Sequence, residues 1–190
     1  MTRVRLDPRH PLVLDVRELG RRAGSMKRVQ REVPAPADLG LELARVPTGD
    51  PLELDLRLEA VVEGVLVSGT VTGTVDGECG RCLDPVHTEI TVDIQELFAY
   101  EDSTTDGSSD DDEVSRLDGD LLDLEPAVRD AIVLALPLAP LCADDCRGLC
   151  PGCGARWDDL PVDHTHDTFD PRWAALADKL GAGTTESQES

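Results

Sequence analysis

The sequence predicts an α+β protein: an antiparallel β-sheet domain, curled or barrel-like, with a zinc-knuckle site and one or two C-terminal helices. Two observations predict this fold class. Residues 52–58 alternate between leucine and charged side chains, which is typical of a strand with one buried face. The cysteines include C-x2-C pairs, a spacing with which two thiolates can reach one metal ion.

The first half of the chain contains the strand signals. After the run 52–58, Glu63-Gly64 interrupts the pattern and a β-branched segment follows over 65–75, so these two runs are predicted to form a hairpin. A third long strand is expected over 89–95, where isoleucine and valine alternate with polar residues. Shorter strands are expected at 12–16, 29–33 and 41–46. We therefore assign residues 1–100 to the β domain, with the first cysteine pair on a turn between two strands.

The second half changes character at residue 101. Eleven acidic residues and one arginine lie between Glu101 and Glu125, and we expect 101–118 to be a disordered acidic loop. A helix is expected over 121–136, with Pro126 in its first turn. Residues 119–180 are expected to pack on the sheet, with the cysteine cluster between this helix and a short one that begins at Pro171. The polar tail 181–190 is expected to be disordered. The predicted apolar face of the first helix consists of Leu124, Val128, Ala131 and Ala135.

Charge is distributed unevenly along the chain. The net charge is −21, with +3 in residues 1–50 and −24 in the rest. Such an acidic chain repels polyanions over most of its surface, which argues against broad nonspecific binding to nucleic acid. The charge could attract a basic partner, or it could serve solubility alone. No apolar run approaches the about 20 residues that a membrane-spanning helix needs, and no secretory signal is recognisable. The expected location is the cytoplasm, where cysteines stay reduced.

The cysteines favour a structural zinc site. Two C-x2-C knuckles of matched spacing predict a four-thiolate set of Cys79, Cys82, Cys150 and Cys153. Two other sets remain open: Cys142 and Cys146 as the residues that complete the site with the first pair, or the four C-terminal cysteines binding metal alone. In the last case Cys79 and Cys82 would remain a free dithiol.

Catalytic signals are weak. A thioredoxin-like role for the first cysteine pair would require a helix N-terminus, and the pair is predicted between strands. His164 and His166 could extend a metal site, although a polar loop is the commoner setting for such residues. The sequence contains no recognisable nucleophile–base arrangement or phosphate-binding glycine loop, so we expect a protein that is not an enzyme.

One segment is basic. Residues 17–31 contain six cations and one glutamate, and Gly20 and Gly24 suggest a loop that could mould to a phosphate backbone. The alternative is that these cations pair with acidic groups of the same protein. The candidate RNA-binding residues are Arg17, Arg21, Arg22, Lys27, Arg28 and Arg31.

Three motifs together resemble a known family. They are the run from Leu14 to Met26, the Glu-Cys-Gly-Arg-Cys-Leu run that ends at Leu83, and the cysteine-rich run from Leu141 to Gly154. They look like the YceD family, the large ribosomal RNA subunit accumulation proteins of bacteria and plastids. The resemblance covers most of residues 10–160, and all six cysteines match the cysteine-rich, Gram-positive-like form of the family.

The resemblance implies a non-enzymatic role in ribosome assembly, supporting accumulation or processing of large-subunit (23S) ribosomal RNA. Its expected partner is that RNA or a basic ribosomal protein of the large subunit, with no membrane and no small-molecule substrate. The RNA could be bound through the basic segment, or the acidic surface could hold a basic ribosomal protein as a chaperone or adaptor would. A redox-active dithiol protein unrelated to ribosomes is a further alternative.

Overall fold

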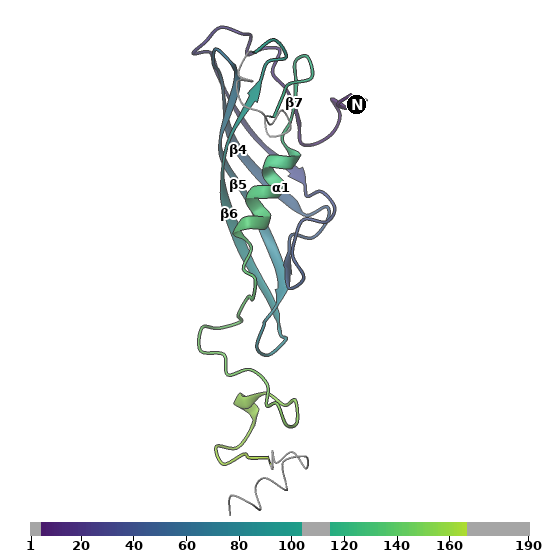
Figure 1. Ribbon diagram of the computed structural model, residues 1–190. Helices are drawn as coiled ribbons and strands as arrows, with labels where there is room; N and C mark the ends of the chain where they lie inside the picture. The colour runs from purple at the N-terminus through teal and green to yellow at the C-terminus, as the bar shows by residue number, and fades with distance from the viewer. Residues whose placement is uncertain (1–4, 104–114, 167–190) are drawn as a thin grey trace, which may run out of the picture.

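Four long antiparallel strands build the sheet of this protein. The structure, a computed structural model, describes residues 5–103 and 115–166 (Figure 1). Strands β2 (Met26–Pro34), β4 (Pro51–Ala60), β5 (Gly64–Glu78) and β6 (Pro85–Ala99) lie side by side in that order. The short β3 (Ala44–Arg45) pairs with β5 beyond the end of β4. The predicted hairpin is confirmed, because β4 and β5 pair antiparallel across a short turn.

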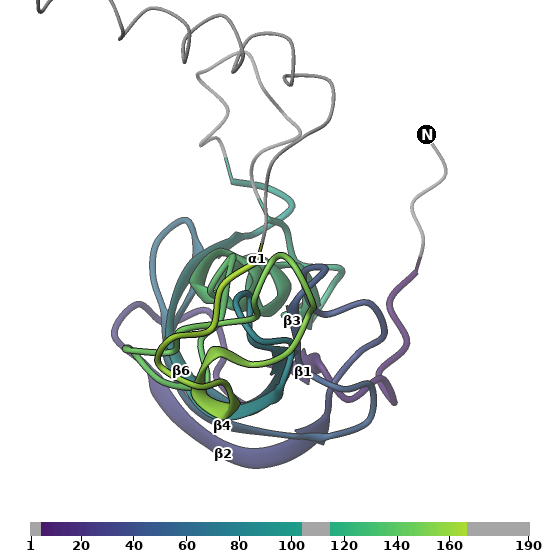
Figure 2. The same cartoon turned by 90° about the horizontal axis from the view of Figure 1, so that it is seen from below.

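The sheet is curled but open. Figure 2 shows β2, β4, β5 and β6 curving around helix α1 (Glu125–Ala135). Strands β2 and β6 form its two edges and, in the described part of the chain, do not pair with each other. The barrel-like alternative is therefore wrong. The helix covers the concave face of this open sheet.

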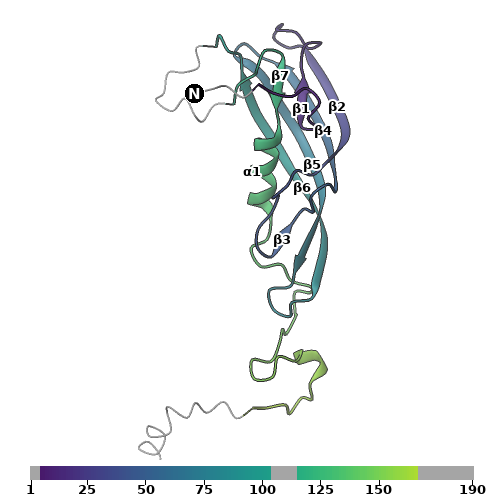
Figure 3. The ribbon, with the colours of Figure 1, turned by 90° about the vertical axis from the view of Figure 1, so that its right-hand side faces the viewer.

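The core lies between the concave face of the sheet and α1. The four leucines of β4 are each at most 2% exposed, and they alternate with charged residues that face solvent. Helix α1 packs against β6, as the side view in Figure 3 shows. Its buried row advances by four residues through Leu124, Val128, Ile132 and Leu136. Ala135, which we predicted on the buried face, is exposed.

Helix α1 begins later than the sequence predicts. Residues Leu121–Asp123 form strand β7, which pairs antiparallel with β1 (Val13–Asp15). The Leu124 N–H donates to the carbonyl of Leu12, and the Glu125 N–H donates to Oδ1 of Asp123. Tertiary pairing with β1 therefore overrides the local helical pattern of residues 121–123. Pro126 lies in the first turn, as predicted.

After α1 the chain leaves the sheet and forms an extended segment at the end where β5 turns into β6 (Figures 1 and 3). This segment contains only a short 3₁₀ helix, η1 (Trp157–Asp159), among the described residues. The predicted helix after Pro171, the tail 181–190 and most of the acidic loop lie outside the described residues. Among the described residues, no helix is long and apolar enough to cross a bilayer.

Candidate metal centre

The first cysteine pair lies on the turn between β5 and β6, as predicted. The Cys79 N–H donates to the carbonyl of Asp84 at 2.8 Å, and the Leu83 N–H donates back to the carbonyl of Cys79 at 2.9 Å. Leu83 takes a left-handed conformation, with φ of 64°. These features wrap the turn around the thiols of Cys79 and Cys82, both of which are buried.

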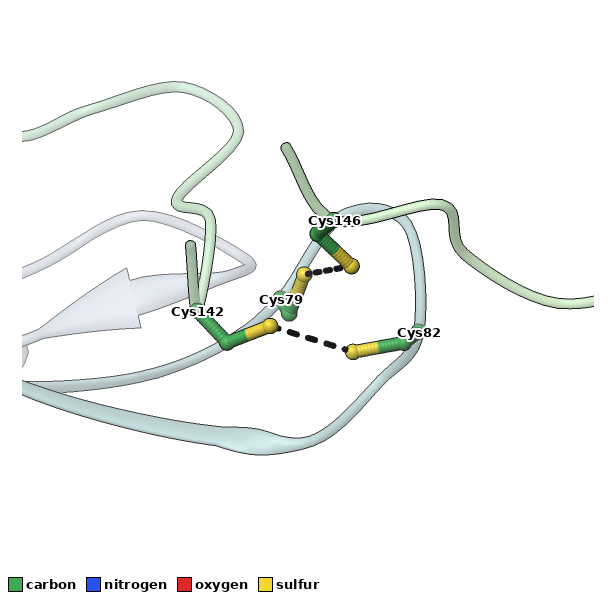
Figure 4. A group of neighbouring side chains, drawn as sticks. All are labelled: Cys79, Cys82, Cys142 and Cys146. Carbon is green, nitrogen blue, oxygen red and sulfur yellow. Dashed lines mark hydrogen bonds between the residues drawn. The ribbon is translucent and has the colours of Figure 1, made fainter. Parts of the chain in front are cut away.

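The second cysteine pair, Cys142 and Cys146, lies in the segment that follows α1. Residues after the helix continue to the β5–β6 turn, where the Gly80 N–H donates to the carbonyl of Pro140 at 2.8 Å. This contact places Cys142 and Cys146 opposite the first pair (Figure 4). Arg81 fixes the same loop from the other side, since its Nη1 donates to the carbonyls of Cys146 at 2.9 Å and Asp144 at 3.3 Å.

The spacing of the four sulfurs is compatible with a tetrahedral site. Sγ of Cys79 is 3.8 Å from Sγ of Cys146, and Sγ of Cys82 is 3.5 Å from Sγ of Cys142. Thiolates placed tetrahedrally at a Zn–S distance of about 2.3 Å have sulfurs about 3.8 Å apart. All four sulfurs lie within 4.8 Å of one another, and three of the four residues are buried. The group can therefore hold a metal ion with protein ligands alone.

The thiols of this group are not electrostatically equivalent. The backbone N–H of Cys142, together with those of Arg81 and Cys82, lowers the pKa of Cys79 to about 6. The Asp84 N–H lowers the pKa of Cys82, but burial and the neighbouring thiols outweigh it and raise that pKa to about 12. A divalent cation bound between the four sulfurs would favour the thiolate form of each of them.

A second group lies further along the same segment. Cys150 and Cys153 are joined there by His164 and His166, and their ligand atoms also lie within 4.8 Å of one another. Nε2 of His164 is 3.5 Å from Sγ of Cys150 and 3.6 Å from Sγ of Cys153. Cys150 is buried, and Cys153 and His166 are exposed.

The cysteine groups in the structure differ from the predicted four-thiolate set. The predicted set of Cys79, Cys82, Cys150 and Cys153 is divided between the two groups, and the structure brings Cys142 and Cys146 to the first pair. Matched C-x2-C spacing favoured the predicted set. In the structure, Cys142 and Cys146 lie at the first knuckle, and the two histidines lie at the second. The two histidines, which we interpreted as part of a polar loop, lie at the second group. Their Cys-x2-Cys…His-x-His order was the available signal.

Comparison with known proteins places this arrangement in a family. The family model described as "Large ribosomal RNA subunit accumulation protein YceD" matches residues 67–178. The matched range includes most of β5, the whole of β6 and α1, and all the cysteines. The chain belongs to the YceD family.

Relatives of this YceD-family chain extend over most of its length. An uncharacterized protein of Mycobacterium tuberculosis is 48% identical over 171 residues, which cover 90% of this chain and 82% of the relative. One of Mycobacterium leprae is 43% identical over 180 residues, covering 95% and 82%. The uncharacterized protein YlbN of Bacillus subtilis is 31% identical over 99 residues, covering 52% and 56%. No solved structure matches the chain.

The basic segment of this YceD-family chain is a loop only as far as Ser25, because β2 begins at Met26. Most of its cations have acidic partners. The ion pairs are Arg17 with Asp15 and Asp120, Arg21 with Asp102, Lys27 with Glu18, and Arg28 with Asp55. These pairs neutralise most of the positive charge that the sequence suggested for binding RNA.

The two remaining cations of the segment differ from each other. Arg31 points to the concave side and donates from Nη2 to the carbonyls of Pro11 and Val13, which ties β2 to the chain entering β1. Burial lowers the pKa of this guanidinium. Arg22 is exposed, and within the described residues its side chain makes no ion pair or hydrogen bond. Only Arg22 of the six candidates therefore presents an uncommitted charge within the described region.

Replacing Leu83 by glycine tests the geometry of the first knuckle. Leu83 is 60% exposed and has φ of 64°, a conformation that costs a non-glycine residue about 1–2 kcal/mol. Glycine removes this strain, and little buried surface is lost with the leucine side chain. Glycine also makes the unfolded state more flexible, which offsets part of the gain. We expect Leu83→Gly to raise the free energy of unfolding by about 0.5–1 kcal/mol. Urea unfolding of the metal-loaded protein measures this change, and a destabilised variant would contradict the left-handed turn.

Proposed function

We propose that the protein is a non-catalytic factor in assembly of the large ribosomal subunit, acting in the cytoplasm to support accumulation or processing of 23S ribosomal RNA. The observation that carries this proposal is the family model, whose description names large-subunit ribosomal RNA accumulation and which covers both cysteine groups. We further propose that Cys79, Cys82, Cys142 and Cys146 hold zinc in a structural role.

The chemistry of the first group supports a structural zinc ion. Four soft thiolates at tetrahedral spacing suit zinc, and a set of four protein ligands leaves no position for a substrate. The group also joins the β5–β6 turn to the segment after α1, which is a connecting role. A bound ion would fix the path of residues 137–146 relative to the sheet.

A second candidate mode of action follows from the ion pairs of the basic segment. Four of its six cations are paired with carboxylates of the same chain, and Arg31 is committed to backbone carbonyls. A segment whose cations are paired in this way offers little charge to a phosphate backbone. The described geometry therefore favours an adaptor that holds a basic ribosomal protein, with its effect on the RNA being indirect.

The convex face of the sheet fits such a basic partner. Glu32 of β2 and Glu53 of β4 lie directly opposite each other, and both are exposed. Like charges at opposed positions destabilise a sheet, so a cation bound between them would relieve the repulsion. Glu89 and Asp93 of β6 are also exposed, across the threonines of β5. The acidic face, defined by these four residues, is the proposed contact surface.

Complementation of a depleted strain tests the proposed function. We expect depletion to lower the ratio of 23S to 16S RNA and the amount of large subunits in sucrose gradients. The variant Arg21→Ser/Arg22→Ser/Arg28→Ser should restore both. Charge reversal of the acidic face, Glu32→Lys/Glu53→Lys/Glu89→Lys/Asp93→Lys, should fail to restore them. The same reversal should weaken binding to basic large-subunit proteins by at least ~10-fold.

Matched controls separate charge from folding. The isosteric Glu→Gln and Asp→Asn changes at the four positions should give an intermediate loss of binding, with unchanged thermal unfolding. Depletion that leaves the RNA ratio unchanged would refute the role in the large subunit. Failure of the arginine variant alone, with loss of salt-sensitive RNA binding, would favour direct RNA contact over the adaptor.

A further inference from the structure

We propose that Cys150, Cys153, His164 and His166 bind a second zinc ion, separate from the one at the first cysteine group. The chain would then carry two ions: one held by four thiolates, and one by two thiolates and two imidazoles. This inference concerns metal content and local folding, and it does not depend on the ribosomal role.

Distances within the second group match this coordination. A thiolate at about 2.3 Å and an imidazole nitrogen at about 2.0–2.1 Å from a tetrahedral ion lie about 3.6 Å apart. Nε2 of His164 is 3.5 Å and 3.6 Å from the two sulfurs, so it has the spacing of a ligand to both. The rings of His164 and His166 meet edge to face at 84°, with centroids 4.5 Å apart.

The backbone around Cys150 repeats the first knuckle. The Cys150 N–H donates to the carbonyl of Ala155 at 2.7 Å, and the Gly154 N–H donates back to the carbonyl of Cys150 at 2.7 Å. Gly154 has φ of 72°, close to the 64° of Leu83 at the equivalent place. The turn at Cys79 thus has a counterpart at Cys150, with equivalent hydrogen bonds and a left-handed residue at the equivalent position. Each knuckle is completed by its own second pair of ligands.

Neighbouring residues position the two histidines. A Cβ at Gly152 would lie 2.4 Å from Cδ2 of His166, so the absent side chain leaves the space that this ring occupies. Trp157 packs edge-on against His164, with centroids 5.8 Å apart. These contacts hold both imidazoles beside the sulfurs.

The two sites should differ in how readily they release metal. Cys79, Cys82 and Cys146 of the first group are buried, whereas Cys153 and His166 of the second are exposed. Solvent and a chelator therefore reach the second site more easily. Residues 147–166, which carry the second site, contact the first knuckle chiefly through two interactions. These are the Arg156–Asp84 ion pair and the hydrogen bond from the Leu149 N–H to the Arg81 carbonyl. We infer that the second ion leaves first and that residues 147–166 lose their fold with it.

Metal analysis of the full chain tests the proposal. Purified under reducing conditions, the protein should contain two zinc ions per chain. Both Cys150→Ser/Cys153→Ser and His164→Ala/His166→Ala should contain one, and far-UV circular dichroism should show an unchanged sheet. The control His87→Ala removes a histidine that is paired with Asp76, outside both groups, and should keep two ions.

A third variant disturbs the site while keeping every ligand. Gly152→Ala should displace His166 and weaken the second ion by at least ~10-fold in chelator competition, while the first ion stays bound. Substitution with Co²⁺ gives an independent readout, because a site with two sulfurs and two nitrogens absorbs visible light differently from a four-sulfur site. The spectrum of the two-sulfur site should vanish in the histidine variant.

Three results would overturn the proposal. One ion in the wild type would exclude a second site. Two ions in His164→Ala/His166→Ala would show that the histidines are not ligands. Loss of both ions in Cys150→Ser/Cys153→Ser, with the sheet intact, would show that these cysteines complete the first site.

Discussion

Replacement of Cys79 by serine is expected to remove the ion of the first group and to release the segment after α1 from the sheet. Cys79 is fully buried, and the backbone N–H groups around its sulfur lower the pKa of its thiol to about 6. Structural zinc contributes folding free energy directly, so its loss is among the largest effects of a single substitution. We expect the free energy of unfolding to fall by about 4 kcal/mol or more.

Release of the segment can be followed by limited proteolysis. Arg147 is exposed but is followed by the buried Gly148, whose backbone lies against Arg81. Trypsin should therefore cleave after Arg147 slowly in the wild type and much faster in Cys79→Ser. The sheet, whose core lies between β4, β5 and α1, should resist digestion under the same conditions.

Two further serine variants separate metal loss from lost packing and identify the ligand set. Cys142 is exposed, so Cys142→Ser removes a ligand and little burial, and it should behave like Cys79→Ser. Cys153→Ser lies in the second group and should leave the first ion bound, although residues 147–166 lose their fold in this variant. If Cys153→Ser instead matched Cys79→Ser, the four-thiolate set would be Cys79, Cys82, Cys150 and Cys153.

Local patterns predicted the long strands well. The alternation over 52–58 places every leucine on the concave face of β4, since side-chain direction in a strand depends only on residue parity. The position of Cys79 and Cys82 on a turn followed from the strands on either side. These features need no knowledge of which distant segments meet.

Features that depend on distant segments were not predictable in this way. The pairing of knuckles is set by the path of residues 137–146, which a contact between Gly80 and Pro140 fixes. The start of α1 depends on β1, more than a hundred residues earlier in the chain. The partners of the basic cations are equally remote, such as Asp102 for Arg21. The spacing of residues in the sequence does not indicate these contacts between distant segments.

A substitution at Gly69 is expected to have the second large effect on stability. This residue lies in the middle of β5, opposite Leu56 of β4 and Ile94 of β6, and has φ of 147°. A Cβ here would lie 2.1 Å from the carbonyl oxygen of Asp55 and 2.9 Å from Cα of Leu56. Both are backbone atoms of β4, so the strands would have to separate to admit a methyl group.

We expect Gly69→Ala to lower the free energy of unfolding by about 3–5 kcal/mol, because conformational strain and overpacking add together. Gly20→Ala is the matched control: Gly20 has φ of 64° and nothing within 4 Å of the added Cβ, so it should cost only about 1–2 kcal/mol. Urea unfolding of both metal-loaded variants measures the difference. Equal costs would mean that the close approach of β4 and β5 does not require glycine. The cysteines lie beyond the end of β5, so the folded fraction of Gly69→Ala should keep the metal content of the wild type.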